Sequence, residues 1–289
     1  MSFNASEKNR LESAAKEIRK YTIDTIGYLG VGHIGGALSI VELLAVLYYR
    51  QMRVDPSQPR MAGRDRLVLS KGHAGPALYS ALALKGFFPM EWLHTLNAGG
   101  TNLPSHCDRN RTPGIDMTTG SLGQGLSAAC GIALANRIDG RKSFTFAVIG
   151  DGESDEGQVW EAAMFAKHSK LSRLIAFTDY NKMQIDGTTE SVLDLGSLEE
   201  KWAAFGWATA RVDGHDVEAI DNAIGEAKLR AEAAELGAAG AGATAGGVPT
   251  MIILDTIKGK GATFCEGLVT NHNMSFTYET AKKAIAELG

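Results

Sequence analysis

Two polar residues follow two short apolar runs of the sequence, and their side chains could bind a metal ion. Asp151 comes after the run 144–149, and Asn181 comes after the run 174–178. A helical pattern at 153–168 lies between them, so the segment predicts a strand, a helix and a parallel strand. Parallel strands of this kind end at the same edge of a sheet. One carboxylate and one amide oxygen at that edge, with a backbone carbonyl nearby, suit a hard divalent cation.

Glycines flank the first of these residues. Gly150 and Gly152 let the backbone approach a diphosphate closely, so the pattern predicts a metal–diphosphate site. In the helix that follows, Ser154 stands at the expected N-cap, and Asp155 and Glu156 stand in the expected first turn. The apolar residues spaced to line one side of this helix are Val159, Trp160, Ala163, Phe165 and Ala166.

Strand and helix patterns alternate along the chain. The predicted strands cover 67–70, 144–149, 174–178, 207–212 and 249–256, and the predicted helices cover 5–29, 37–52, 126–138, 153–168, 197–205 and 217–235. This alternation predicts an α/β fold with a mostly parallel central sheet and helices on both faces. The Gly/Ala-rich run at 237–247 cannot pack a core, so we expect it to be a mobile surface loop within one domain spanning 1–289.

Composition excludes several classes of protein. The chain has 289 residues, of which 44% are hydrophobic, so it can bury a substantial core. Its net charge of −4 gives no electrostatic reason to expect nucleic acid or an anionic membrane as a partner. The charged N-terminal segment lacks the apolar core of a signal peptide, and no stretch has the roughly 18 apolar residues of a spanning helix. Three cysteines without metal-like spacing indicate reduced thiols in a cytoplasmic protein.

Four histidines stand in glycine-rich or irregular segments, where a side chain can reach a ligand. These are His33 in the glycine-rich segment 29–36, His73 after the strand 67–70, His106 in the irregular segment 87–116, and His272 after the turn 258–261. Imidazoles can hydrogen-bond the hydroxyl groups of a sugar and transfer protons near pH 7. From the residues alone, each could instead be a histidine of a turn or of the surface.

Several of these motifs together resemble the transketolase family. The GDG at 150–152, followed by Asn181 and by IDG at 185–187, resembles the thiamine diphosphate signature of transketolase-like enzymes. The segments DRLVLSKGHAGPALYSAL (65–82) and TTGSLGQG (118–125) are also similar to segments of that family. The resemblance implies a thiamine diphosphate-binding fold that covers essentially the whole chain.

The resemblance also implies roles for individual residues. Asp151, Asn181 and the carbonyl of Met183 would hold Mg²⁺ or Ca²⁺, and that metal would bind the diphosphate of the cofactor. His33, His73, His106 and His272 would be the catalytic histidines. The cofactor itself would contact His73, Gly120, Leu122, Gly150, Asp151, Gly152, Glu156, Asn181, Ile185 and His272, with Gly120 and Leu122 against its rings.

By the same resemblance, the reaction is the transfer of a two-carbon ketol unit from a ketose to an aldose. Full-length transketolases use a glutamate of a second domain to activate the cofactor, and no second β/α domain follows before Gly289. We therefore expect the N-terminal subunit of a split transketolase. A C-terminal subunit with a pyrimidine-binding domain would be its partner in an α₂β₂ assembly. Sugars or sugar phosphates would be its substrates, with pentose phosphates as the default.

Two alternatives remain at this point. The α subunit of a 2-oxo acid dehydrogenase shares the GDG-and-asparagine pattern, although the segments around His73 and Gly120 fit transketolase better. A non-catalytic nucleotide-binding or regulatory α/β protein could also contain such a strand–helix–strand unit. The four histidines argue against this second alternative.

Overall fold

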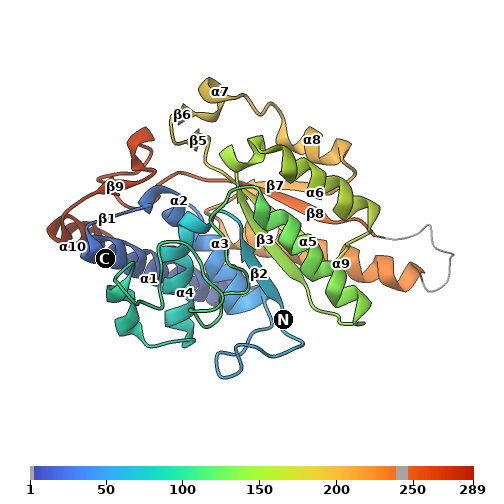
Figure 1. Ribbon diagram of the computed structural model, residues 1–289, viewed down its shortest axis with the longest axis horizontal. Coiled ribbons are helices and arrows are strands. Elements are labelled where there is room, and N and C mark those ends of the chain that lie inside the picture. Colours follow the sequence, from blue (N-terminus) through green and yellow to red (C-terminus); the bar gives the residue numbers. More distant parts are fainter. Residues whose placement is uncertain (1–2, 239–246) are drawn as a thin grey trace.

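Five parallel strands form the central sheet of the computed structural model, which describes residues 3–238 and 247–289 (Figure 1). Their order across the sheet is β2 (Arg66–Leu69), β3 (Thr145–Gly150), β4 (Leu174–Tyr180), β8 (Thr250–Asp255) and β7 (Ala208–Asp213). Every neighbouring pair is parallel. All five predicted strands are confirmed, within a residue or two at their ends, and so is the predicted parallel arrangement.

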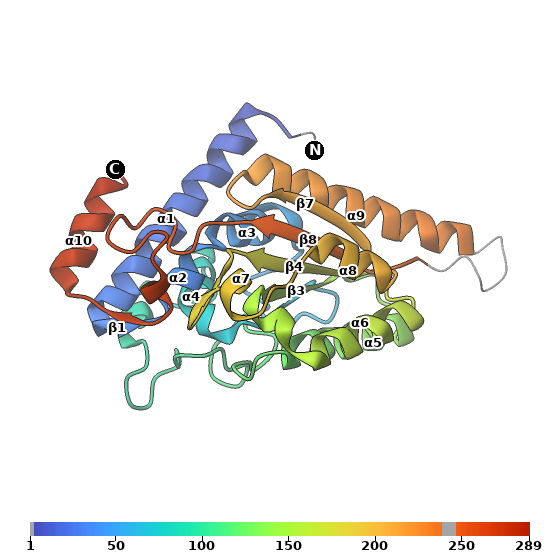
Figure 2. The same cartoon turned by 90° about the horizontal axis from the view of Figure 1, so that it is seen from above.

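Helices cover both faces of this sheet (Figure 2). The core on one face is formed with α1 (Ala5–Leu29), α3 (Val41–Val46), α4 (Gly75–Lys85) and α9 (Val217–Ala238). The core on the other face is formed with α5 (Gln124–Ile138), α6 (Gly157–His168) and α8 (Leu198–Ala204). Alternate residues of β3 serve the two cores, since Phe146 and Val148 pack on the first side and Ala147 and Ile149 on the second. The predicted α/β layers are therefore confirmed.

Short elements surround the carboxyl edge of the sheet. Strand β1 (Val31–Gly32) pairs with β9 (Met274–Ser275), and β5 (Met183–Gln184) pairs with β6 (Gly187–Thr188) in a hairpin directly after β4. The remaining α-helices are α2 (Ile34–Leu38), α7 (Thr189–Val192) and α10 (Tyr278–Glu287). Short 3₁₀ helices occupy Gly72–Ala74, Met90–Thr95, Gly152–Asp155 and Val269–Asn271, and a π turn occupies Leu47–Gln51.

The prediction of one continuous helix over 37–52 was wrong. The segment is divided into α2, α3 and the π turn, with a break at Ser39 and Ile40. Ser39 Oγ donates hydrogen bonds to the carbonyl of Gly36 (3.1 Å) and to Asp179 Oδ2 at the end of β4 (2.7 Å). Serine side chains compete with the helical backbone in this way. The break therefore brings a polar side chain to the carboxyl edge of the sheet.

The start of the predicted helix 153–168 was also wrong, because α6 begins at Gly157. Ser154 does not cap it; its Oγ donates to the carbonyl of Gly150 (3.0 Å), and residues 152–155 form a 3₁₀ turn instead. Glu156 is the N-cap residue but makes no capping hydrogen bond through its side chain. Val159, Ala163 and Ala166 are buried as predicted, whereas Phe165 is 44% exposed. The apolar stripe is narrower than the sequence indicated.

The remaining structural expectations concern irregular segments, the cysteines and membrane helices. Residues 87–116 contain one short 3₁₀ helix at 90–95 and are otherwise irregular, as predicted. Most of the Gly/Ala-rich run lies outside the described residues, because α9 extends to Ala238 and the description resumes at Gly247. The three cysteines are buried and unpaired. Within the described ranges, no helix is long and apolar enough to cross a membrane.

We predict that Phe146→Ala lowers the free energy of unfolding by about 3–5 kcal/mol, because it removes a fully buried ring from the central sheet. The ring centroid of Phe146 lies 6.3 Å from those of Phe144 and Phe177. Removal of the Phe146 ring therefore leaves a cavity beside these two rings unless they move. Phe165→Ala is the control and should cost about 1 kcal/mol or less. Urea denaturation of both variants is the measurement. Equal losses would contradict the placement of Phe165 outside the core.

Candidate active site

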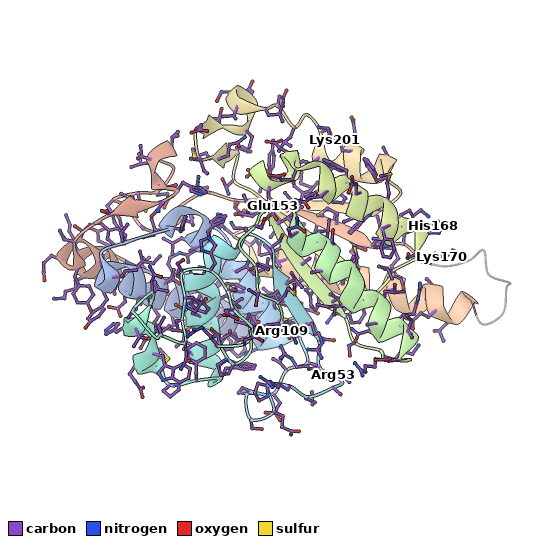
Figure 3. The ribbon with its side chains drawn as sticks, in the orientation of Figure 1. Arg53, Arg109, Glu153, His168, Lys170 and Lys201 are labelled. Atoms are coloured by element: carbon purple, nitrogen blue, oxygen red, sulfur yellow. The ribbon has the colours of Figure 1, made fainter. Side chains whose placement is uncertain are left out.

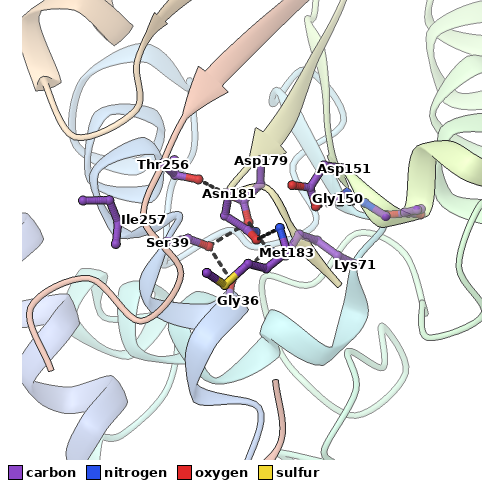
Figure 4. Close-up of polar contacts among 12 residues, drawn as sticks. Gly36, Ser39, Lys71, Gly150, Asp151, Asp179, Asn181, Met183, Thr256 and Ile257 are labelled. Carbon is purple, nitrogen blue, oxygen red and sulfur yellow. Dashed lines mark hydrogen bonds and ion pairs between the residues drawn. The ribbon is translucent and has the colours of Figure 1, made fainter. Parts of the chain in front are cut away.

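Asp151 and Asn181 lie close together at the carboxyl ends of β3 and β4, as predicted (Figure 4). The amide of Asp151 donates to the carbonyl of Asp179 (3.2 Å), and the amide of Lys182 donates to Asp151 Oδ2 (2.6 Å). The amide of Met183 in turn donates to Asn181 Oδ1 (3.1 Å). These bonds bring the side chains of the predicted metal site to a single edge of the sheet, with Met183 beside them.

Asp151 is a buried carboxyl group with no ion-pair partner among the described residues. Its side chain is almost completely buried, and it accepts one backbone hydrogen bond on each oxygen, from Gly152 (2.8 Å) and Lys182 (2.6 Å). Burial, followed by the charge of Asp179, raises the pKa of Asp151 to about 7. Each carboxylate oxygen keeps a second lone pair. A bound cation would use these lone pairs and would stabilise the ionised form.

The donor set fits a hard divalent cation. One carboxylate (Asp151), one side-chain amide oxygen (Asn181) and one backbone carbonyl (Met183) are all oxygen ligands, the kind that Mg²⁺ and Ca²⁺ prefer. No group of three or more His, Cys, Asp or Glu side chains among the described residues could hold a metal. A metal here would therefore depend on the amide and carbonyl oxygens, with phosphate or water completing the coordination.

A buried ion pair lies next to Asn181 of the predicted metal site (Figure 4). Lys71 Nζ forms an ion pair with Asp179 Oδ2 and donates to the carbonyl of Gly36 (2.9 Å). Asp179 also accepts hydrogen bonds from Ser39 (2.7 Å), Thr256 (2.5 Å) and Asn181 Nδ2 (3.0 Å). Burial alone would raise the pKa of Asp179, but the Lys71 charge and these hydrogen bonds outweigh it and lower the pKa. The amide of Asn181 is oriented by this pair.

A second buried carboxylate, Glu153, connects three segments of the site. Its Oε1 accepts hydrogen bonds from the amide of Gly123 (2.8 Å) and from Ser70 Oγ, and its Oε2 accepts from the amide of Gly150 (2.9 Å). The amide of Gly125 donates to the same Ser70 oxygen (3.1 Å), and a Cβ on Gly125 would lie only 2.3 Å from that oxygen. Glu153 therefore holds the ends of β2 and β3 against the segment 120–125, which leads into α5.

A pocket opens over these groups at the carboxyl edge of the sheet. The predicted site residues that line it are His73, Leu122, Gly150, Asp151, Gly152, Asn181, Met183, Ile185 and His272. Lys258 also lines it, and its Nζ is buried without a hydrogen-bond partner among the described residues. Burial, followed by the charge of Lys71, lowers the pKa of Lys258 to about 8. The pocket thus contains an unpaired amine near an under-compensated carboxylate.

The four predicted histidines form one cluster beside the pocket. The ring centroid of His33 lies 5.3 Å from that of His73, 5.6 Å from that of His106 and 5.4 Å from that of His272. Burial is the largest cause that lowers the pKa of each histidine, and for His272 the pKa falls to about 4. All four imidazoles are therefore neutral at pH 7, a state in which they can both accept and donate hydrogen bonds.

Four predicted site residues lie outside the lining of the pocket. His33 and His106 belong to the histidine cluster, and Gly120 lies against the ring of His106, since a Cβ on Gly120 would be 3.3 Å from His106 Cδ2. Glu156 is exposed at the start of α6 and packs against the loop at Gly123. The other predicted site residues all line the pocket.

The sequence interpretation missed four charged residues of the site, namely Lys71, Glu153, Asp179 and Lys258. Asp179 could have been found, because it is an acidic residue at the end of an otherwise apolar strand and therefore needs a buried partner. Lys71 and Lys258 stand beside recognised motifs, at SKGH and KGKG, but nothing in the sequence distinguishes a buried lysine from an exposed one there. Glu153 follows GDG directly and was assigned only to the start of a helix.

Comparison with known proteins identifies the family. Residues 11–289 match the model described as transketolase, thiamine diphosphate binding domain. The chain belongs to the transketolase family. It is an N-terminal transketolase subunit, whereas neither a 2-oxo acid dehydrogenase nor a regulatory protein is favoured.

Relatives of this transketolase chain include both single subunits and longer chains. It is 58% identical over 278 residues to the 6-deoxy-6-sulfo-D-fructose transketolase subunit SqwG of Clostridium sp. (strain MSTE9), covering 96% of each chain. It is 37% identical over 278 residues to one subunit of the apulose-4-phosphate transketolase of Phocaeicola vulgatus, covering 96% of this chain and 93% of the other. It is 35% identical to the transketolase of Mus musculus, of which it covers 42%.

Solved transketolases share the fold of this chain. The transketolase of Campylobacter jejuni superposes with a TM-score of 0.86 at 28% identity, over 100% of this chain and 43% of that chain. The R525L mutant of the Pichia stipitis enzyme superposes with a TM-score of 0.85 at 32% identity, over 96% of this chain and 40% of the other. The predicted thiamine diphosphate-binding fold is therefore confirmed.

We predict that Glu153→Gln lowers the free energy of unfolding by about 1–3 kcal/mol, because one acceptor oxygen becomes an NH₂ group that faces the Ser70, Gly123 or Gly150 donor. The variant should also weaken cofactor binding, since the segment 120–125 loses its attachment. Glu12→Gln, at an exposed position of α1, is the control and should change stability by less than about 0.5 kcal/mol. Urea denaturation at pH 7.5 is the measurement, and equal stabilities of both variants would show that Glu153 does not organise the site.

Proposed function

We propose that this chain is the diphosphate-binding subunit of a two-chain transketolase, and that residues 1–289 act as one domain. Together with a C-terminal subunit, it transfers a two-carbon ketol unit from a ketose to an aldose. The observation that carries the proposal is the meeting of the Asp151–Asn181 pair, the buried Lys258 and four neutral histidines at one edge of the sheet. This set can bind an anionic cofactor through a metal beside groups suited to a sugar.

The family match supports thiamine diphosphate as the cofactor. In our proposal Asp151, Asn181 and the carbonyl of Met183 hold Mg²⁺ or Ca²⁺, which neutralises the diphosphate, and Gly150 and Gly152 leave room for it. His73, His272, Ile185 and Glu156 contribute to cofactor binding, and Gly120 and Leu122 lie against its rings. When bound, the cofactor supplies the reactive carbon and the electron sink needed to cleave a bond next to a ketose carbonyl.

The histidines orient the sugar and move its protons. Each imidazole is neutral at pH 7, because burial lowers its pKa, so it can accept a proton from a substrate hydroxyl and return it to an oxygen. His33 and His106 lie outside the cofactor pocket in the same cluster, which supports a role toward substrate. His73 and His272 line the pocket itself and serve both substrate and cofactor.

A partner chain completes the site. Two relatives that match this chain over almost their whole length are named as subunits, which supports a second chain that carries the pyrimidine-binding domain. We propose an α₂β₂ assembly, the simplest closed arrangement of two such sites. The three buried, unpaired cysteines agree with a reducing compartment such as the cytoplasm.

The substrate that we propose is a ketose with an anionic group at its far end. The relative with 58% identity is named for 6-deoxy-6-sulfo-D-fructose, and the relative with 37% identity for apulose 4-phosphate. Both names describe a ketose with a sulfonate or phosphate. The higher identity makes a sulfonated ketose the first substrate to assay, ahead of the pentose phosphates that the sequence suggested.

We predict that Asp151→Ala abolishes the metal-dependent binding of thiamine diphosphate, because a methyl group cannot replace a carboxylate on the cation. Asn181→Ala should weaken binding at least about tenfold. The control is Asp139→Ala, which removes an exposed carboxylate at the end of α5. Isothermal titration with thiamine diphosphate and Mg²⁺ is the measurement, on the chain together with its partner. Unchanged affinity in Asp151→Ala would contradict the metal site.

The full chain alone should show no ketol transfer, and mixing it with the pyrimidine-domain subunit should restore activity. The reason is chemical: cofactor activation requires a carboxylic acid at the pyrimidine, and we assign that group to the partner. A coupled assay with a sulfonated ketose and with a pentose phosphate, at saturating cofactor and Mg²⁺, tests this expectation. Turnover by this chain without a partner would refute the two-chain proposal.

A further inference from the structure

A second cavity lies at the opposite end of β2 from the active site, at the amino end of that strand. It has a volume of about 460 Å³ and is enclosed by the segments 59–66 and 109–116. Figure 3 shows Arg109 well separated from Glu153, which marks the active-site edge. We call this cavity the arginine pocket, because its lining includes Arg60, Arg64, Arg66, Arg109 and Arg111.

The arginine pocket has far more positive than negative charge. Asp116 is the acidic residue of its lining, and two arginines already share it: Arg64 Nη2 donates to Oδ2 (2.8 Å) and Arg66 Nη1 donates to Oδ1 (3.2 Å). The amide of Leu67 also donates to Asp116 Oδ2 (2.9 Å). The single negative charge of Asp116 is therefore shared by two guanidinium groups. The chain as a whole has a net charge of −4, so this cationic pocket is not a consequence of composition.

The positive charges of the other three arginines, Arg60, Arg109 and Arg111, are poorly neutralised by acidic side chains of the protein. Arg111 lies 3.8 Å from Asp108 in an exposed pair and donates to the carbonyl of Thr101 (3.2 Å). The guanidinium groups of Arg60 and Arg109 have no hydrogen-bond or ion-pair partner within residues 3–238 and 247–289. Several like charges around one cavity repel one another unless an anion lies between them. Arg60, Arg109 and Arg111 are exposed, so water and salt screen much of this repulsion, and a polyanion in contact with several of them would remove more of it.

A buried arginine connects the two walls of the pocket. Arg64 is almost completely buried and also donates to the carbonyl of Pro59, so it joins the two walls through Asp116. Arginine forks match the oxygens of phosphate and sulfonate groups in bidentate geometry. The cavity is larger than a single oxyanion needs and lies within the usual size range of small-molecule sites. No aromatic side chain lines it, which disfavours a stacked nucleobase.

We propose that the arginine pocket binds a small polyanion, a compound that carries two or more phosphate or sulfonate groups, at a site separate from the catalytic centre. The proposal does not depend on the function assigned above.

Binding there would act on a loop of the active site. Residues 109–116 form the middle of a loop whose two ends carry His106 and Gly120. The ends are joined by hydrogen bonds from the amide of Thr119 to the carbonyl of Cys107 (3.0 Å) and from the amide of Arg109 to Thr118 Oγ1 (3.2 Å). A polyanion that contacts Arg109 and Arg111 would hold this loop against Arg60 and Arg66. Amide hydrogen exchange over 107–119 should then slow.

The test is isothermal titration of the full chain with pyrophosphate at low ionic strength and without divalent metal. We expect Arg109→Gln/Arg111→Gln to weaken binding at least about tenfold, because it removes two charge-assisted contacts. Arg60→Gln, on the other wall, provides an independent variant. The control Arg230→Gln/Lys283→Gln removes the same charge from exposed positions elsewhere and should change affinity less than about twofold. Asp151→Asn should also leave binding unchanged.

Titrations with other anions identify the class of ligand. Sulfate, a single oxyanion, should bind at least about tenfold more weakly than pyrophosphate. A sugar bisphosphate that binds more tightly than pyrophosphate would indicate a metabolite, and the reverse would indicate an inorganic polyanion. Equal binding to the wild type and to both pocket variants would overturn the proposal. Loss of binding in Asp151→Asn, loss in the charge control, or unchanged hydrogen exchange over 107–119 would overturn it as well.

Discussion

The ion pair between Lys71 and Asp179 is the interaction on which the active site depends. Both groups are almost completely removed from water, where a charge is tolerated only if its partner and its hydrogen bonds are in place. The pair joins the end of β2 to the end of β4. Through Gly36, Ser39 and Thr256 it also fixes the ends of α2 and β8. The break between α2 and α3 lies at Ser39, whose hydroxyl group donates a hydrogen bond to Asp179 of this pair.

The charges around this pair explain why the site suits a metal and a diphosphate together. Asp179 is compensated by Lys71, and Glu153 is compensated by backbone and hydroxyl donors. Asp151 has only two backbone donors, and burial raises its pKa to about 7. Lys258 has no partner for its buried amine among the described residues, and burial lowers its pKa to about 8. A cation at the carboxylate and a diphosphate near the amine would satisfy both groups at once.

Much of this arrangement could be predicted from the sequence, because it follows from local patterns. Apolar runs and a helical period predicted the β3–α6–β4 unit. Because its strands are parallel, Asp151 and Asn181 must lie at the same edge of the sheet. The sequence did not predict three features: the interruption of the helix at Ser39, the exposure of Phe165 and the start of α6 at Gly157. They depend on hydrogen bonds to Asp179 and Gly150 and on packing against distant elements. The burial of Lys71 and Glu153 has the same origin, since most of their partners lie far away in the sequence.

The position of a metal ion in the assembled enzyme tests the central claim most directly. Crystals of this chain with its partner, thiamine diphosphate and Ca²⁺ would give an anomalous signal for the ion. The ion should lie about 2.3–2.6 Å from a carboxylate oxygen of Asp151, the side-chain oxygen of Asn181 and the carbonyl oxygen of Met183. Two further ligands should be diphosphate oxygens. An ion at another edge of the sheet, or a diphosphate bound without contact to Asp151, would contradict this assignment.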